Sequence, residues 1–271
     1  MPLLRRLRHE VAKSPVRAPL VWIRHKSLKP SDVFFASYPR SGSTWLRFLL
    51  FDALVGEPSG FSSVNHAIPD VKLHKYGMRL MPGGGRLIKT HEVFHPEYHK
   101  AVYLVRDSRD VALSEFAYQT ALGLVSSDLD EYLQKFLTQG VNPFASWHAH
   151  VDSWLSAPLG QDQLLIIRFE DLRVDPFKTI VQIVQFLALT PDETRIRAAI
   201  ANNTVEKMRA KEKETPQRAS ARGRFIRSGA AGGWRGTLTS AQVQLFRQYA
   251  GDSLSRLGYS LDVEPAEAIT V

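Results

Sequence analysis

Short apolar runs separated by polar turns are the dominant pattern along the chain. Four of them are too short and too rich in β-branched and aromatic residues for helices, and they predict buried strands: Val33–Ser37, Arg86–Lys89, Ala101–Val105 and Leu164–Arg168. Helical spacing of apolar residues follows several of these runs, near residues 43–54, 108–120, 128–138, 145–156, 176–188, 192–201 and 239–256. This alternation predicts an α/β fold: a single domain with a central parallel sheet flanked by helices.

The region between about residues 210 and 233 lacks this pattern. Lys, Arg, Glu, Gly and Ser dominate it, which predicts a long loop. Loops of that length inside a compact domain are usually functional or disordered.

Length and composition narrow the classes of protein to consider. A chain of 271 residues can bury one sizeable core. It has no apolar run of the length that a membrane span needs and no secretory signal, so we expect a cytoplasmic protein. The absence of cysteine excludes disulfides, thiolate metal ligands and a cysteine nucleophile.

Most of the net charge of +8 lies near the N-terminus, where residues 1–29 hold eight Lys or Arg side chains and one Glu. We therefore expect a basic tail over 1–29, one domain over 30–260 and a C-terminal tail over 261–271. A solvated tail is the favoured interpretation, and the helical spacing of its apolar residues leaves open peripheral contact with an anionic membrane or a partner protein. The nearly neutral remainder does not favour nucleic acid as a partner.

The first predicted strand leads into a tight turn and then a helix. The turn reads Tyr38-Pro39-Arg40-Ser41-Gly42-Ser43-Thr44-Trp45. Backbone N–H groups converge at such a helix N-terminus, and Arg40 adds a planar cation, so the segment predicts a P-loop-like phosphate-binding turn. The alternative is an ordinary helix capped by Ser or Thr. One glycine and no lysine distinguish the turn from the loop of Mg²⁺-dependent kinases.

Two other strand ends carry residues suited to anions. The second predicted strand ends in Lys89-Thr90-His91, which places a cation and a group that titrates near neutrality where parallel sheets hold ligands. The third leads into a helix with Arg106 at its start and Ser114 about two turns later, and both can reach a separate phosphate. The structural alternatives are an ordinary histidine and an Arg–Asp pair on a helix surface.

A metal site is the less favoured interpretation of His148, His150 and Asp152. Residues two apart on a helix point to different faces, so we expect these side chains to be structural.

Taken together and in this order, the segments resemble those of sulfotransferases that use 3′-phosphoadenosine 5′-phosphosulfate (PAPS), over about residues 31–258. The turn at 38–45 resembles the 5′-phosphosulfate loop of that family, with Arg40 where the family has lysine. Lys-Thr-His resembles its catalytic segment, and the helix from Arg106 to Ser114 its 3′-phosphate motif. Phe169 stands where the family has a tyrosine near the adenine. Arg227, Ser228 and Gly229 resemble its 3′-phosphate clamp, with Ser228 in place of lysine.

The resemblance implies transfer of a sulfuryl group from PAPS to a hydroxyl of a small-molecule, glycan or lipid-linked acceptor, with the bisphosphate PAP as product and no metal. It implies catalytic roles for His91 as general base and for Lys89 and Arg40 as cations. The residues implied in nucleotide binding are Arg40, Ser41, Gly42, Ser43, Thr44, Trp45, Arg106, Ser114, Phe169, Arg227, Ser228 and Gly229. The alternatives are a P-loop-like nucleotide kinase and a non-catalytic nucleotide- or membrane-binding module.

Overall fold

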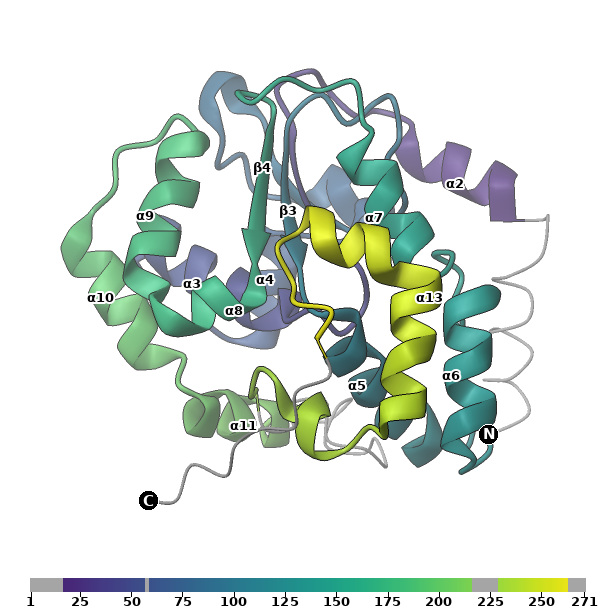
Figure 1. Cartoon of the computed structure of the whole chain (residues 1–271). Coiled ribbons are helices and arrows are strands. Elements are labelled where there is room, and N and C mark those ends of the chain that lie inside the picture. The colour runs from purple at the N-terminus through teal and green to yellow at the C-terminus, as the bar shows by residue number, and fades with distance from the viewer. Residues whose placement is uncertain (1–16, 57–58, 216–228, 263–271) are drawn as a thin grey trace.

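A computed structural model describes residues 17–56, 59–215 and 229–262 (Figure 1). Four strands form one sheet in the order β2 (Leu87–Thr90), β1 (Val33–Ser37), β3 (Ala101–Val105) and β4 (Leu164–Arg168). All neighbouring strands are parallel, and Ala36 on β1 lies opposite Thr90 on β2 and Tyr103 on β3. The predicted single α/β domain with a central parallel sheet is confirmed.

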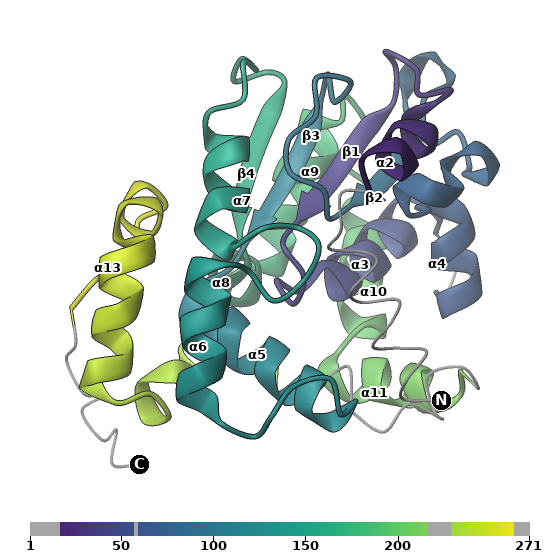
Figure 2. The same ribbon diagram turned by 90° about the vertical axis from the view of Figure 1, so that its right-hand side faces the viewer.

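Helices cover both faces of this sheet (Figures 1 and 2). One face packs against α3 (Ser43–Val55), α4 (Phe61–Ala67), α9 (Pro176–Phe186) and α10 (Glu193–Asn202). The other packs against α5 (Ser108–Ala121), α6 (Leu129–Thr138), α7 (Trp147–Leu155) and α13 (Ser240–Arg256). The shorter elements are α2 (Arg17–His25), α8 (Phe169–Val174), α11 (Val205–Lys213) and the 3₁₀ turns η1 (Val71–Tyr76), η2 (Pro82–Gly84) and η3 (Gly233–Gly236). None of the helices in the described ranges is long and apolar enough to cross a bilayer.

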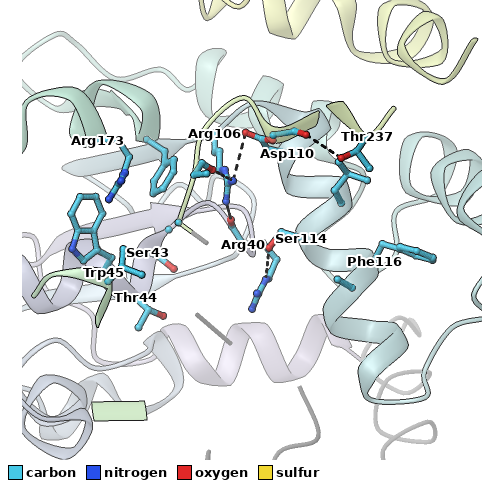
Figure 3. A pocket seen from close by; sticks show the side chains of 18 of the residues that line it. Arg40, Ser43, Thr44, Trp45, Arg106, Asp110, Ser114, Phe116, Arg173 and Thr237 are labelled. Atoms are coloured by element: carbon cyan, nitrogen blue, oxygen red, sulfur yellow. Dashed lines mark hydrogen bonds and ion pairs between the residues drawn. The ribbon is translucent and has the colours of Figure 1, made fainter. Parts of the chain in front are cut away.

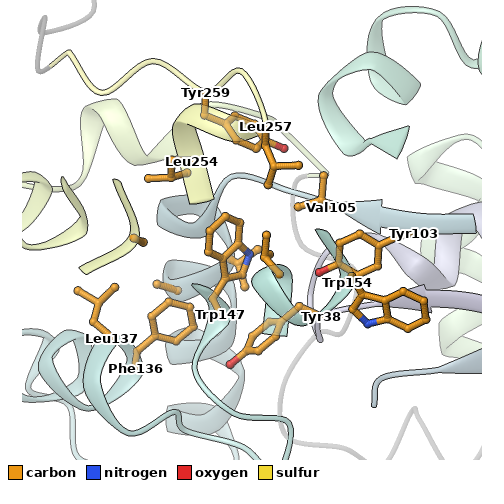
Figure 4. Close-up of a cluster of buried hydrophobic side chains, with 14 of the residues drawn as sticks. Tyr38, Tyr103, Val105, Phe136, Leu137, Trp147, Trp154, Leu254, Leu257 and Tyr259 are labelled. Carbon is orange, nitrogen blue, oxygen red and sulfur yellow. The ribbon is translucent and has the colours of Figure 1, made fainter. Parts of the chain in front are cut away.

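Alternating side chains of the central strand enter two separate cores, as a strand buried on both faces requires. Val33 and Phe35 pack toward α3 and α9, whereas Phe34 and Ala36 pack toward α7 and α13. Aromatic rings fill the second core: Tyr103 stacks on Trp154 with ring centroids 5.3 Å apart (Figure 4). Burial of rings of this size supplies a large share of the folding free energy.

The parallel arrangement brings all four strand ends to one edge of the sheet. The turn to α3 follows β1, His91 follows β2, Arg106 follows β3, and Phe169 begins α8 directly after β4. The carboxyl edge of an open α/β sheet is the usual ligand site, so the fold assembles segments that lie far apart in the sequence.

Part of the predicted solvated tail is folded. Residues 17–25 form α2, and the ring of His25 is buried and hydrogen-bonded to the Tyr98 hydroxyl over 2.6 Å. The sequence alone did not predict this, because the helix is held by a contact 73 residues away. Residues 1–16 lie outside the described residues.

The first residues of the segment 210–233, which the sequence predicts as a loop, are helical. Helix α11 extends to Lys213, with Thr204 as its N-cap, and η3 begins at Gly233. Met208 is the one large apolar side chain that α11 buries. The ammonium of Lys211 donates to the Ser59 hydroxyl at 2.9 Å and to the Asn203 side chain at 2.8 Å, so polar contacts replace the apolar period that signals a helix.

Candidate active site

The turn between β1 and α3 has the backbone of an anion-binding nest. Arg40 and Gly42 both adopt left-handed conformations, with φ of 68° and 94°. Gly42 is the N-cap of α3, and in the described structure no side chain caps this helix. Amides at its first turn are therefore available to an anion, which argues against an ordinary Ser- or Thr-capped helix.

Glycine is required at position 42 for two reasons. Its positive φ is strained for other residues, and a Cβ added there would lie 2.5 Å from Cδ2 of Phe169. The Phe169 ring also packs edge-on against Trp45, with ring centroids 6.2 Å apart. The phosphate turn and the residue after β4 thus meet without space for a methyl group.

A pocket of about 350 Å³ opens beside this turn (Figure 3). It is lined by many of the residues implied in nucleotide binding: Arg40, Gly42, Ser43, Thr44, Trp45, Arg106, Ser114, Phe169 and Gly229. Ser41 does not line it, and its buried hydroxyl has no hydrogen-bond partner among the described residues. Lys89 and His91 lie outside this pocket. Arg227 and Ser228 fall outside the described residues.

Arg106 forms one wall of the pocket. Its guanidinium donates to the carbonyl oxygens of Ala230 at 2.8 Å and Arg40 at 3.3 Å, and lies 4.7 Å from the centre of the Phe169 ring. Its ion pair with Asp110 spans 3.6 Å, and the two side chains are only 12% and 4% exposed. The surface Arg–Asp pair considered from the sequence is therefore wrong, since this pair is buried against the pocket.

Asp110 was not singled out by the sequence. Its carboxylate accepts hydrogen bonds from the backbone N–H groups of Gly232 at 2.7 Å and Trp234 at 3.0 Å. These bonds tie α5 to the glycine-rich segment that closes the pocket. No pattern links positions 122 and 124 residues apart, so only the structure identifies this contact.

Arg40 points from the turn toward α5 (Figure 3). Its Nε donates to the Ser114 hydroxyl at 3.2 Å, and its guanidinium lies 4.8 Å from the centre of the Tyr118 ring. The residue predicted for the 5′-phosphosulfate and one predicted for the 3′-phosphate are therefore in contact. The two predicted phosphate sites share one pocket.

His91 is fixed in one tautomer by the end of β1. Its Nδ1 lies 2.6 Å from the carbonyl oxygen of Ser37, which can only accept, so Nδ1 carries the proton and Nε2 is left as an acceptor. Burial and then the positive charge of Lys89 hold the pKa of His91 well below its usual value. The ring is therefore neutral near pH 7, as a general base must be.

Lys89 is paired with a residue that the sequence did not reveal. Its Nζ lies 3.3 Å from Oδ2 of Asp70, and the lysine side chain is 12% exposed. Burial lowers the pKa of Lys89 to about 8, against the opposing effect of the Asp70 carboxylate. Asp70 sits outside any recognisable motif, and only a parallel bridge between its backbone and that of Lys89 places it here.

The residues considered as an alternative metal site form hydrogen bonds with other groups of the protein. The ring nitrogens of His150 lie 3.0 Å from the Tyr103 hydroxyl and 3.1 Å from the carbonyl oxygen of His91. Asp152 accepts from the Ser253 hydroxyl at 2.9 Å. The described residues contain no group of three or more His, Asp or Glu side chains arranged for a metal. His150 supports the segment that carries His91.

Comparison with known proteins places this site in a family. A model of the sulfotransferase domain matches residues 30–258. Sulfotransferase 2A2 of Mus musculus is 30% identical over 247 residues, which cover 83% of this chain and 85% of that protein. Sulfotransferase 1B1 of Mus musculus is 28% identical over 243 residues, 80% of each chain.

Solved structures show the same fold at lower identity. Mouse sulfotransferase SULT7A1, crystallised with PAP, superposes with a TM-score of 0.69 at 23% identity and covers 88% of this chain and 90% of its own. Retinol dehydratase in complex with androsterone and PAP superposes with a TM-score of 0.65 at 23% identity, covering 86% of this chain and 83% of its own. The chain therefore belongs to the family of PAPS-dependent sulfotransferases.

Proposed function

We propose that this protein transfers a sulfuryl group from PAPS to the hydroxyl of an acceptor, with His91 as general base. One observation carries the proposal: the hydrogen bond from Nδ1 of His91 to the carbonyl oxygen of Ser37 leaves Nε2 free of a proton. Ser37 lies three residues before Arg40, so this bond holds the imidazole at the strand that leads into the turn. The low pKa of the ring supports the same role, because a neutral imidazole can accept a proton.

The pocket beside the turn suits the donor. The uncapped amides of α3 and the hydroxyl groups of Ser43 and Thr44, which line the pocket, provide donors for a phosphosulfate. The rings of Trp45 and Phe169 offer apolar surface to a purine. Arg106, Ser114 and Gly229 line the part of the pocket that we assign to the 3′-phosphate. We assign Arg227 and Ser228 to the closing segment by resemblance alone.

The chemistry follows from these positions. A bond forms between the acceptor oxygen and sulfur as the bond from sulfur to the phosphate oxygen breaks, and PAP leaves. Nε2 of His91 takes the proton of the acceptor hydroxyl. Lys89 and Arg40 stabilise the negative charge on the transferred group and on the leaving phosphate, so fixed cations supply the electrostatic stabilisation. Arg40 keeps its proton, unlike the lysine usual in the family, and acts only through its charge.

The acceptor belongs to the class of compounds with a free hydroxyl: a small molecule, a glycan or a lipid-linked molecule. Structures of retinol dehydratase contain androsterone or retinol together with PAP. These neighbours support a small hydroxyl compound bound beside the donor.

The test separates binding from transfer. The wild-type chain should bind PAP in calorimetry without Mg²⁺, and His91→Ala should bind it nearly as well. Transfer of label from PAPS to acceptors in a cell extract should fall by about 10²- to 10⁴-fold in that variant. His99→Ala, which alters an exposed histidine, is the matched control. Failure of wild-type PAP binding, or strict dependence on ATP and Mg²⁺, would reject the proposal and favour the kinase alternative.

A further inference from the structure

Exposed apolar side chains are concentrated on two elements far from the pocket. The described residues leave six large hydrophobic side chains exposed, and four of these lie on α2 or η1: Trp22 (61% exposed), Ile23 (55%), Leu73 (51%) and Tyr76 (74%). Soluble surfaces tolerate single exposed residues, but a group of them marks an interaction site.

The two elements are held together as one surface. Arg86 donates to the carbonyl oxygen of Ser27, just after α2, at 3.0 Å and to that of His74 in η1 at 3.1 Å. Nε2 of His74 lies 3.1 Å from the carbonyl oxygen of Lys26. The apolar side chains of α2 and η1 therefore project from a single fixed platform. Arg86, which contacts both elements, directly precedes β2, so α2 and the end of η1 lie at the amino edge of the sheet. The start of η1 lies nearer the active site, since its N-cap Asp70 pairs with Lys89.

The two segments that form this platform carry charge of one sign. Segments 17–29 and 71–79 contain seven Lys or Arg and no Asp or Glu. Lys26, Lys72 and Lys75 are exposed, and the ammonium of Lys26 lies 4.0 Å from the centre of the Trp22 ring. Three acidic residues beside the platform are paired with cations: Glu92 with Arg24 at 3.8 Å, Asp32 with Arg86, and Asp70 with Lys89.

We propose that α2 and η1 form a docking face for an anionic lipid bilayer. We define this face by Trp22, Ile23, Leu73 and Tyr76 together with Lys26, Lys72 and Lys75. Exposed Trp and Tyr beside Lys side chains match the interface between headgroups and acyl chains, where rings insert and ammonium groups meet lipid phosphates. The absence of Asp and Glu from segments 17–29 and 71–79 favours an anionic bilayer over a protein partner. The inference does not depend on the reaction that the active site performs.

The test uses the full chain and vesicles of phosphatidylcholine, alone or mixed with phosphatidylserine. Sedimentation with the mixed vesicles should far exceed sedimentation with neutral ones, and added salt should weaken it. Trp147, Trp154 and Trp234 are buried and Trp45 is half-buried in the pocket, so a blue shift of tryptophan emission should report insertion of Trp22. Trp22→Phe should remove that shift.

Variants in η1 separate this face from the basic residues at positions 1–16. Leu73→Ser with Tyr76→Ser should reduce vesicle binding strongly, and Lys72→Gln with Lys75→Gln should reduce it about fivefold for each lysine. Val174→Ser changes a side chain that is 86% exposed elsewhere, and should bind vesicles like the wild type. PAP calorimetry confirms that each variant is folded.

Three outcomes would overturn the proposal. If the wild-type protein does not bind anionic vesicles at low salt, α2 and η1 do not form a docking face for lipid. If both η1 double variants bind these vesicles as well as the wild type does, the proposal is likewise wrong. Loss of binding on neutralising Arg5, Arg6 and Arg8, with normal binding of the η1 variants, assigns the attraction to the N-terminal residues instead.

Discussion

The carboxylate of Asp70 lies 3.3 Å from the ammonium of Lys89, at the end of the strand that leads to His91. Burial opposes the charge on Lys89, and the carboxylate partly restores it. Arg47 and Lys72, whose charges also act on Lys89, favour its neutral form. Among the described residues, Asp70 is therefore the acidic neighbour that maintains the charge of the proposed catalytic lysine.

The first prediction concerns the alkaline limb of the pH profile. In the proposed mechanism Lys89 must be protonated to stabilise the transferred group, and burial lowers its pKa to about 8. The value of kcat/KM for PAPS should therefore fall as pH rises through about 8. Lys89→Arg should move this limb to higher pH, because arginine does not deprotonate. An unmoved limb in that variant would show that another group causes it.

Asp70→Asn should move the same limb in the opposite direction. Removal of the carboxylate lowers the pKa of Lys89, so the lysine is neutral in a larger fraction of molecules at neutral pH. Activity at a fixed pH above the limb should fall roughly tenfold for each unit by which the limb moves. Asp70→Asn combined with Lys89→Arg should be insensitive to pH in this range. A purely structural role of Asp70 would instead lower activity equally at every pH.

We expect His91 to set the acidic limb of the pH profile. The pKa of the ring is well below the usual value near 6.5 because of burial, so the neutral form persists under mildly acidic conditions. Activity should hold at pH 6.5 and fall only at lower pH, as the ring becomes protonated. The measurement is kcat/KM against pH on the acid side, with PAP binding as the check on folding. A midpoint at or above 6.5 would contradict the assignment.

Gly42→Ala should weaken both folding and nucleotide binding. The added methyl group would lie 2.5 Å from the Phe169 ring at a φ of 94°. We expect a loss of about 1–3 kcal/mol in the free energy of unfolding from the backbone strain, with the clash added to it. Gly123→Ala is the matched control, because Gly123 also has a positive φ (67°) but no atom within 4 Å of the added Cβ. Urea unfolding and PAP calorimetry measure the two effects, and equal losses in both variants would refute the role of the close approach.

Asp110→Asn should loosen the segment that closes the pocket. The asparagine side chain has one acceptor oxygen instead of two, so it loses a bond to Gly232 or Trp234 and the ion pair with Arg106. We expect PAP to bind about tenfold more weakly, in line with the loss of one charge-assisted hydrogen bond. Asp130→Asn, on the exposed surface of α6, should bind PAP normally. Wild-type affinity in Asp110→Asn would contradict the proposed positioning role.

The pattern of apolar runs and turns was sufficient for the fold class and most of the elements. The strands at Val33–Ser37, Ala101–Val105 and Leu164–Arg168 match the predicted bounds, because buried strands have a local signature of short β-rich runs. The turn around Gly42 was also predicted from the sequence, because an anion-binding nest and the helix after it are built from consecutive residues.

Contacts between distant segments were decided only by the tertiary structure. Three contacts join positions that no local pattern connects: the ion pair of Asp70 with Lys89 and the hydrogen bonds of Asp110 with Gly232 and of Arg40 with Ser114. The packing of α2 against Tyr98 likewise depends on the tertiary structure, which brings together His25 and Tyr98, 73 residues apart. Sequence determines local conformation through backbone propensity and apolar spacing, whereas charge pairing and pKa depend on distance and burial, which exist only once the sheet has assembled.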